Sequence, residues 1–129
     1  MNLSSLVQQS KYVVTITTST SNGANTKGTI SIKFRGTNGE STLFTFKKGL
    51  DKGEVTTMNY ELTSIGTLTQ VYLELDELAD TWRFATVSIT VDGSDLFYFD
   101  KSAVLYTDIP NIWLNCNFLF FFLSLFFFF

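Results

Sequence analysis

Acidic side chains gather in two short stretches of the second half of the chain. Asp76, Glu77 and Asp80 lie in one stretch, and Asp92 and Asp95 lie in the other. Carboxylates on loops are the ligands that Ca²⁺ prefers, so these residues would form a calcium site if both stretches fall at one end of the fold. The alternative is a pair of solvated acidic turns, since Asp-Gly is an ordinary hairpin signal. No other cofactor is predicted.

Three lysines, Lys47, Lys48 and Lys52, surround Leu50 between two glycines. A β-sandwich that docks on a membrane needs apolar residues at loop tips and cations that meet anionic headgroups. This cluster therefore predicts a membrane-docking tip, with ordinary solubility as the alternative role of the lysines.

Leu78 and Trp82 form a second docking candidate, although the carboxylates beside them would oppose anionic lipid. The alternative role of Trp82 is that of a core residue whose indole N–H is hydrogen-bonded, as buried tryptophans usually are.

Catalytic chemistry has little support in this sequence. The chain has no histidine and one cysteine, Cys116, which excludes Ser-His-Asp triads, histidine-ligated metals and thiolate-rich zinc sites. Cys116 is expected to be a buried apolar residue or, alternatively, to form a disulfide with another chain. The sequence predicts a binding protein and neither an enzyme nor a receptor for a small-molecule substrate.

The charge balance argues against a nucleic-acid partner. The formal net charge is −3, whereas nucleic-acid-binding domains are usually basic with clustered Lys and Arg. Residues 1–60 carry seven basic and three acidic side chains, and residues 61–129 carry two and nine. This asymmetry permits a basic patch without establishing one.

The two ends of the chain differ from its middle. Residues 1–10 lack the basic start and apolar run of a signal peptide, and we expect them to be a short extension. Residues 117–129 are almost entirely Phe and Leu, too short as a helix to span a bilayer. Three origins remain open for this hydrophobic low-complexity tail: a gene-model artefact, a truncated anchor or an interfacial tail. The folded domain is expected at 11–116.

Alternation of apolar and polar residues dominates the middle of the chain and predicts half-buried antiparallel strands. The turns carry Gly, Asn and Asp, and residues 36–39 (Gly-Thr-Asn-Gly) predict a hairpin with an Asn-Gly primed turn. We predict an all-β, two-sheet antiparallel sandwich of about eight strands. The expected strands are 12–17, 29–35, 42–47, 55–62, 68–75, 82–91, 96–99 and 110–116.

The order of these segments resembles the PLAT (lipoxygenase-homology) domain family over roughly residues 11–116. The segments that carry the resemblance are Tyr12 to Thr17, Gly23 to Thr26, Ile30 to Phe34 with its following turn, Lys52 to Val55 with Thr57-Met58, Ile65 to Leu68, Val71 to Leu73, Trp82 to Val91 and Leu96 to Phe99.

The resemblance implies a non-catalytic β-sandwich that docks on a lipid membrane or on a protein partner. The compartment stays open, with peripheral association with a membrane as one alternative. Some family members bind calcium through acidic loop residues, but here Lys27 stands where many have an acidic residue. Two alternatives stay open: a C2-like calcium-dependent phospholipid-binding module, and a lipase- or lipoxygenase-associated domain that lacks its catalytic part.

Overall fold

Ten strands make up the fold of the computed structural model, which describes residues 9–76, 80–93, 95–99, 103–106 and 108–116. The strands are β1 (Gln9–Thr18), β2 (Thr26–Gly36), β3 (Gly39–Glu40), β4 (Phe44–Leu50), β5 (Val55–Thr63), β6 (Leu68–Leu75), β7 (Trp82–Val91), β8 (Asp95–Phe99), β9 (Ala103–Leu105) and β10 (Asn111–Asn115). Within this part of the chain, no helix is long and apolar enough to cross a membrane.

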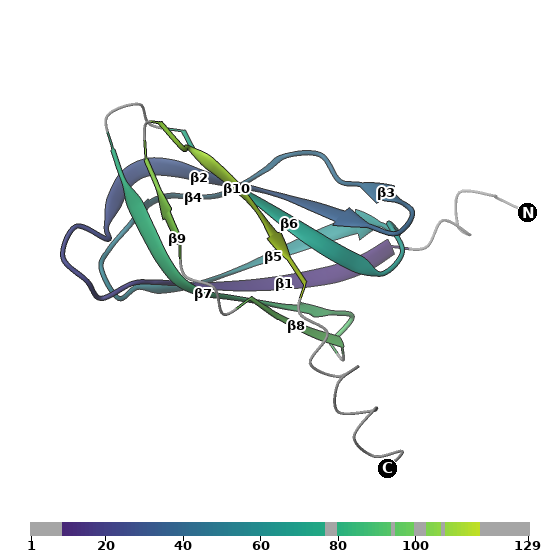
Figure 1. Cartoon of the computed structure of the whole chain (residues 1–129). Helices are drawn as coiled ribbons and strands as arrows, with labels where there is room; N and C mark the ends of the chain where they lie inside the picture. The colour runs from purple at the N-terminus through teal and green to yellow at the C-terminus, as the bar shows by residue number, and fades with distance from the viewer. Residues whose placement is uncertain (1–8, 77–79, 94, 100–102, 107, 117–129) are drawn as a thin grey trace, which may run out of the picture.

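The strands form two five-stranded antiparallel sheets (Figure 1). Sheet A has the order β5-β1-β7-β8, and β9 also pairs with β7. Sheet B has the order β10-β6-β2-β3, and β4 also pairs with β2. The predicted antiparallel sandwich is therefore confirmed.

The core lies between the two sheets because alternate residues of each strand point inward. In β1, for example, Tyr12, Val14 and Ile16 are buried. Opposite them, Phe34 of β2 lies with its ring centroid 5.0 Å from that of Tyr12. The predicted inward positions of the other strands are largely buried too, among them Ile30, Ile32, Phe46, Val71, Leu73, Leu75, Val87 and Ile89.

Trp82 is the first residue of β7, belongs to the core and is 0% exposed. Its Nε1–H donates a hydrogen bond of 3.1 Å to Oγ1 of Thr18, which is also buried. This bond satisfies the only polar atom of the indole, as burial requires. Trp82 therefore has the core role, and the prediction that it docks on a membrane is wrong.

The sandwich has two ends, which differ in the connections that they carry. Because the sheets are antiparallel, the ends of β1, β4, β6 and β9 meet the beginnings of β2, β5, β7 and β10. We call this the Asp80 end; its connections are 19–25, 51–54, 76–81 and 106–110. The opposite, Asp92 end carries the turns after β2, β5 and β7, and the two ends lie far apart in Figure 1.

The hairpin after β2 differs from the predicted turn. Gly36 pairs with Gly39, so Thr37 and Asn38 are the central residues. Neither has a positive φ, so this is not an Asn-Gly primed turn. The return strand begins as the two-residue β3, and β4 starts only at Phe44. Position 36 has no room for a side chain, because a Cβ there would lie 2.2 Å from the carbonyl oxygen of Ile65.

Candidate functional site

The predicted lysine cluster lies at the Asp80 end, with Lys47 and Lys48 in β4 and Lys52 in the turn from β4 to β5. Lys48 and Lys52 are exposed there. Leu50, in contrast, is 1% exposed and belongs to the core. The prediction of an apolar docking tip at Leu50 is therefore wrong: β4 continues to residue 50, and the strand alternation turns that side chain inward.

Glu54 fixes this turn through three hydrogen bonds to its carboxylate. Oε1 accepts from the backbone N–H of Asp51 at 3.0 Å, and Oε2 accepts from Nζ of Lys47 at 2.5 Å and from Oγ1 of Thr56 at 2.6 Å. The Asp51 N–H, together with the Lys47 and Thr56 bonds, lowers the pKa of Glu54 from 4.5 to about 2. The charge of Lys47 is thus already paired, and only Lys48 and Lys52 of the cluster face solvent without a described partner.

Asp80 has a structural role at the same end of the sandwich. Its Oδ2 accepts from Oγ1 of Thr26 at 2.5 Å and from the N–H of Lys27 at 2.8 Å, and its Oδ1 accepts from the N–H of Thr81 at 2.8 Å. Partial burial opposes ionisation, but the bonds from Thr26 and from neighbouring backbone N–H groups outweigh it and lower the pKa of Asp80. The carboxylate therefore ties the start of β7 to the start of β2.

Asp92 lies at the other end of the molecule. Its Oδ1 accepts from the backbone N–H of Lys11 at 2.8 Å, and its own N–H donates to the carbonyl oxygen of Lys11. Both Asp92 (φ 53°) and Gly93 (φ 78°) have a positive φ, which confirms the tight turn predicted at this dipeptide. The idea that the two acidic stretches share one end is therefore wrong.

The residues that the structure describes contain no group of three or more His, Cys, Asp or Glu side chains that could hold a metal ion. Asp76 is exposed, but Glu77 and Leu78 fall outside the described residues, as does the side chain of Asp95. A calcium site that combines Asp76, Glu77 and Asp80 remains a prediction.

Exposed apolar side chains occur at both edges of the Asp80 end, on β5 and between β9 and β10. Four large apolar residues of the described chain are exposed: Leu43 (49%), Val55 (63%), Tyr106 (36%) and Ile109 (52%). Val55 begins β5 directly after the lysine turn, and Tyr106 and Ile109 form a β-bridge in the connection from β9 to β10. Sequence reasoning missed these three residues, although the Ile109-Pro110 pair marks a turn that could carry an apolar tip.

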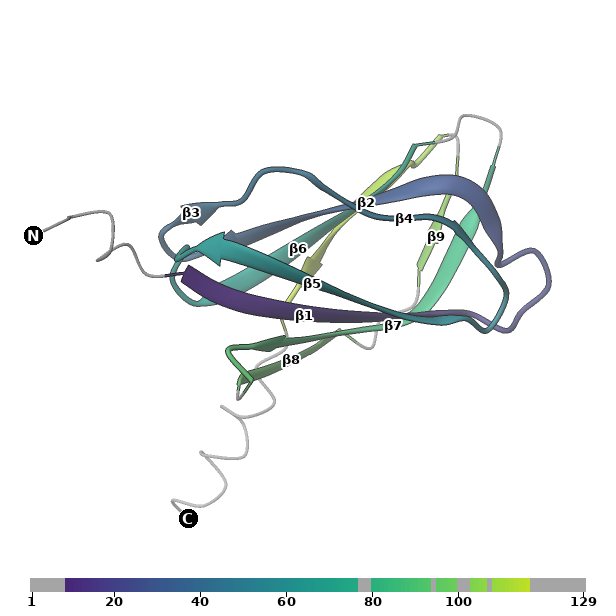
Figure 2. The ribbon, with the colours of Figure 1, turned by 180° about the vertical axis from the view of Figure 1, so that it is seen from behind.

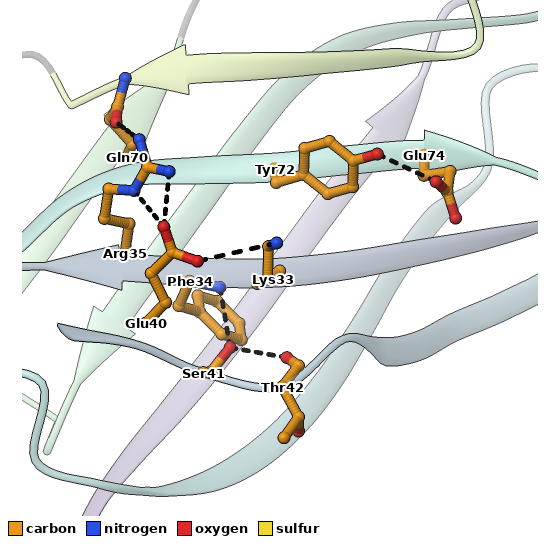
Figure 3. A network of polar contacts seen from close by, with 9 residues as sticks. All are labelled: Lys33, Phe34, Arg35, Glu40, Ser41, Thr42, Gln70, Tyr72 and Glu74. Carbon is orange, nitrogen blue, oxygen red and sulfur yellow. Dashed lines mark hydrogen bonds and ion pairs between the residues drawn. The ribbon is translucent and has the colours of Figure 1, made fainter.

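A second polar cluster covers the outer face of sheet B (Figure 3). Arg35 donates from Nε to Oε1 of Glu40 at 2.6 Å and from Nη1 to Oε1 of Gln70 at 2.7 Å. Its guanidinium carbon lies 3.9 Å from the ring centroid of Trp113. Lys33 pairs with Glu40 at 3.7 Å and lies above Tyr72. Because both cations are already paired and stacked, this cluster braces neighbouring strands and offers no open anion site.

The comparisons with known proteins agree with this architecture. The profile of the PLAT/LH2 domain family matches residues 12–108. The chain belongs to the PLAT/LH2 family. The resemblance inferred from the order of segments is thereby confirmed. PLAT domains bind membrane lipid surfaces in general, and they are themselves non-catalytic.

Solved structures show the same fold in larger proteins. A LOX deletion variant has a TM-score of 0.76 and 18% identity, with 85% of this chain and 17% of that chain covered. Coral 8R-lipoxygenase has a TM-score of 0.72 and 18% identity, with 83% of this chain and 17% of that chain covered. Clostridium perfringens alpha-toxin has a TM-score of 0.64 and 16% identity, with 86% of this chain and 32% of that chain covered. The chain thus spans about a sixth of the lipoxygenases and about a third of the toxin. A search of curated proteins finds no match.

Proposed function

We propose that this PLAT sandwich is a non-catalytic docking module that binds a membrane lipid surface through its Asp80 end. The observation that carries the proposal is that three of the four exposed large apolar side chains in the described chain lie at this one end: Val55 at the β5 edge, and Tyr106 and Ile109 at the opposite edge, between β9 and β10. Exposed apolar side chains at both edges of one end, beyond the scattered single residues that any surface carries, favour that end of the sandwich as an interaction surface.

Lys48, near the end of β4, and Lys52, in the turn that precedes Val55, lie at the same end and support the choice of a lipid partner. A cation near an anionic leaflet contributes about 1 kcal/mol of attraction, and the attraction falls as salt is added. Asp51, Asp76 and Asp108 lie at the same end, so the net charge there does not favour anionic lipid strongly. Insertion of apolar side chains therefore supplies the larger part of the expected binding free energy, and the lysines supply the salt-dependent part.

The apolar part is tested by co-sedimentation with anionic phosphatidylserine–phosphatidylcholine vesicles. The chain used ends at Cys116, because the Phe-rich residues beyond it would bind lipid indiscriminately, and it retains every buried core residue of the part that the structure describes. A Val55→Ser, Ile109→Ser double variant should pellet much less than the parent. Leu43→Ser is the matched control, since Leu43 is equally exposed but lies away from the Asp80 end. Equal pelleting of the double variant and the parent rejects the proposal.

The electrostatic part is tested by reversing the two solvent-facing lysines. Lys48→Glu with Lys52→Glu should weaken binding to anionic vesicles at low salt, and the difference should shrink at high salt. Lys11→Glu, an exposed lysine at the Asp92 end, should bind as the parent does. If Lys11→Glu weakens binding as much as the double variant, the orientation proposed here is wrong.

Calcium and protein partners are distinguished in the same assay. Coral 8R-lipoxygenase is described as calcium-activated through a C2-like domain. If this chain binds vesicles only with calcium, and Asp76→Asn with Asp80→Asn abolishes that binding, the C2-like alternative is favoured. A stable complex with a protein that is insensitive to added vesicles would favour protein docking.

A further inference from the structure

Strand β5 differs from the other edge strands of the two sheets in lacking the features that usually prevent an edge from pairing with another chain. Edge strands are usually protected from pairing with another chain by short length, bulges, Lys or Pro. In the described part of the chain β3, β8, β9 and β10 have five residues or fewer. β4 carries Lys47 and Lys48 and shows two shifts of register against β2. β5 has nine residues, Val-Thr-Thr-Met-Asn-Tyr-Glu-Leu-Thr, with no Lys, Arg, Pro or Gly.

The register of β5 shows which of its backbone groups face outward. β5 pairs with β1 from Val55 to Thr63 without a shift, and the carbonyl oxygen of Glu54 accepts from the N–H of Thr18. Because bonded and non-bonded positions alternate in an antiparallel pair, the N–H and C=O groups of the odd-numbered residues 55 to 63 point away from β1. Five residues thus present a continuous row of donors and acceptors along this edge.

Two half-buried apolar side chains accompany this row. Met58 and Tyr60 alternate with the outward residues and pack against the core without being covered completely. Beside them, a groove of about 370 Å³ runs between β5 and the 38–44 segment, lined in part by Phe44, Leu62 and Ile65. Figure 2 shows β4 and β5 as the edges of the two sheets along this open side, and the hydroxyl of Tyr60 donates to the carbonyl oxygen of Thr45 across it.

We propose that β5 pairs in an antiparallel manner with β5 of a second copy of this chain, so that two sheets A join into one continuous sheet. A two-fold axis at Asn59 pairs all nine residues: Asn59 faces its own copy, Thr57 faces Glu61, and Val55 faces Thr63. No like charges then stand opposite each other. On the inward side Met58 faces Tyr60, a thioether–aromatic contact that the two-fold axis makes twice.

Charge supports a second copy as the occupant. The beginning of β5 adjoins Lys48 and Lys52, and Glu61 lies near its end, where no ion pair to its carboxylate is found among the described residues. An antiparallel arrangement brings the lysine-bearing end of each strand toward the glutamate-bearing end of the other. Like-charged ends would meet in a parallel pair. The strand is therefore complementary to itself in backbone, apolar contacts and charge.

Site-directed cross-linking of the full chain tests this register. Residues opposite each other have Cβ atoms about 5 Å apart, whereas residue 55 of one copy would lie roughly 27 Å from residue 55 of the other. With a short bis-maleimide, Asn59→Cys should give at least about tenfold more covalent dimer than Val55→Cys or Thr63→Cys alone. An equimolar mixture of the last two variants should cross-link about as well as Asn59→Cys.

The unaltered chain is the control for Cys116, which is buried and should contribute little. Association through the Phe-rich tail would cross-link all three single variants alike, and that result would overturn the proposal.

Asn59→Lys sets two ammonium groups opposite each other and should shift the protein to monomer in sedimentation velocity, whereas Asn22→Lys, on an exposed loop, should not. A parent that is monomeric at high micromolar concentration would also overturn it, and would leave the edge to a strand from another protein.

Discussion

The carboxylate of Glu54 holds the turn that carries Lys52 and joins β4 to β5. Its replacement by Gln is expected to weaken the fold in a pH-dependent manner. A pKa lowered from 4.5 to about 2 corresponds by linkage to at most about 3 kcal/mol of stability at neutral pH. The Lys47 and Glu54 side chains are 38% and 22% exposed. Solvent therefore screens the pair, and we expect a loss of about 1–2 kcal/mol.

The sign of the pH dependence follows from the direction of the shift. Because folding lowers the pKa of Glu54, its contribution is complete above pH 4.5 and disappears as the pH falls toward 2. The free energy of unfolding of Glu54→Gln should therefore lie below that of the parent at pH 7, and the two should converge near pH 2.

Urea unfolding followed by the fluorescence of buried Trp82 measures this difference at pH 7, 4 and 2.5. Glu61→Gln is the matched control, because Glu61 is exposed and its carboxylate has no hydrogen bond or ion pair among the described residues. It should change the free energy of unfolding little at any pH. A Glu54→Gln difference that is absent at pH 7, or that stays the same at pH 2.5, would refute the reasoning.

Three further changes test the core and the close contacts. Thr18→Val leaves the buried indole N–H of Trp82 without an acceptor and should cost about 1–3 kcal/mol in urea unfolding; an unchanged midpoint would show that the bond contributes nothing. Gly36→Ala places a Cβ 2.2 Å from the carbonyl oxygen of Ile65 and should cost about 1–3 kcal/mol of stability, measured as a lower melting temperature; an unchanged melting temperature would contradict the close contact. Burial raises the pKa of Cys116 to about 11, so its thiol should react with Ellman's reagent at pH 8 only as the protein unfolds; rapid reaction in the folded state would contradict its burial.

Strands whose alternation is regular were predictable from the sequence. The alternation at 68–75 gives β6 with its observed bounds, and β7 begins at the predicted Trp82. Side-chain direction within these strands follows from the period of two, which requires only local information. The three-residue β9 was missed because three residues are too few to show any period.

The predicted docking site failed where it depended on strand ends and on contacts between distant segments. The lysines around Leu50 indicate a loop tip, but β4 extends to Leu50 and buries it. A joint calcium site for Asp80 and Asp92 requires that their two loops share an end of the sandwich, whereas antiparallel pairing of β1 and β7 places them at opposite ends. Only the order of strands in the sheets reveals such placements, and the sequence alone does not provide it.

The central claim, that the Asp80 end is the surface that meets lipid, is tested most directly by a fluorophore that reports its surroundings. Ile109→Cys and Leu43→Cys each carry an environment-sensitive dye on a residue with about half of its surface exposed, and the buried Cys116 should stay unlabelled. Addition of anionic vesicles should shift the emission of the dye at residue 109 to the blue and leave that at residue 43 unchanged. A shift at residue 43 alone, or equal shifts at both, would contradict the account.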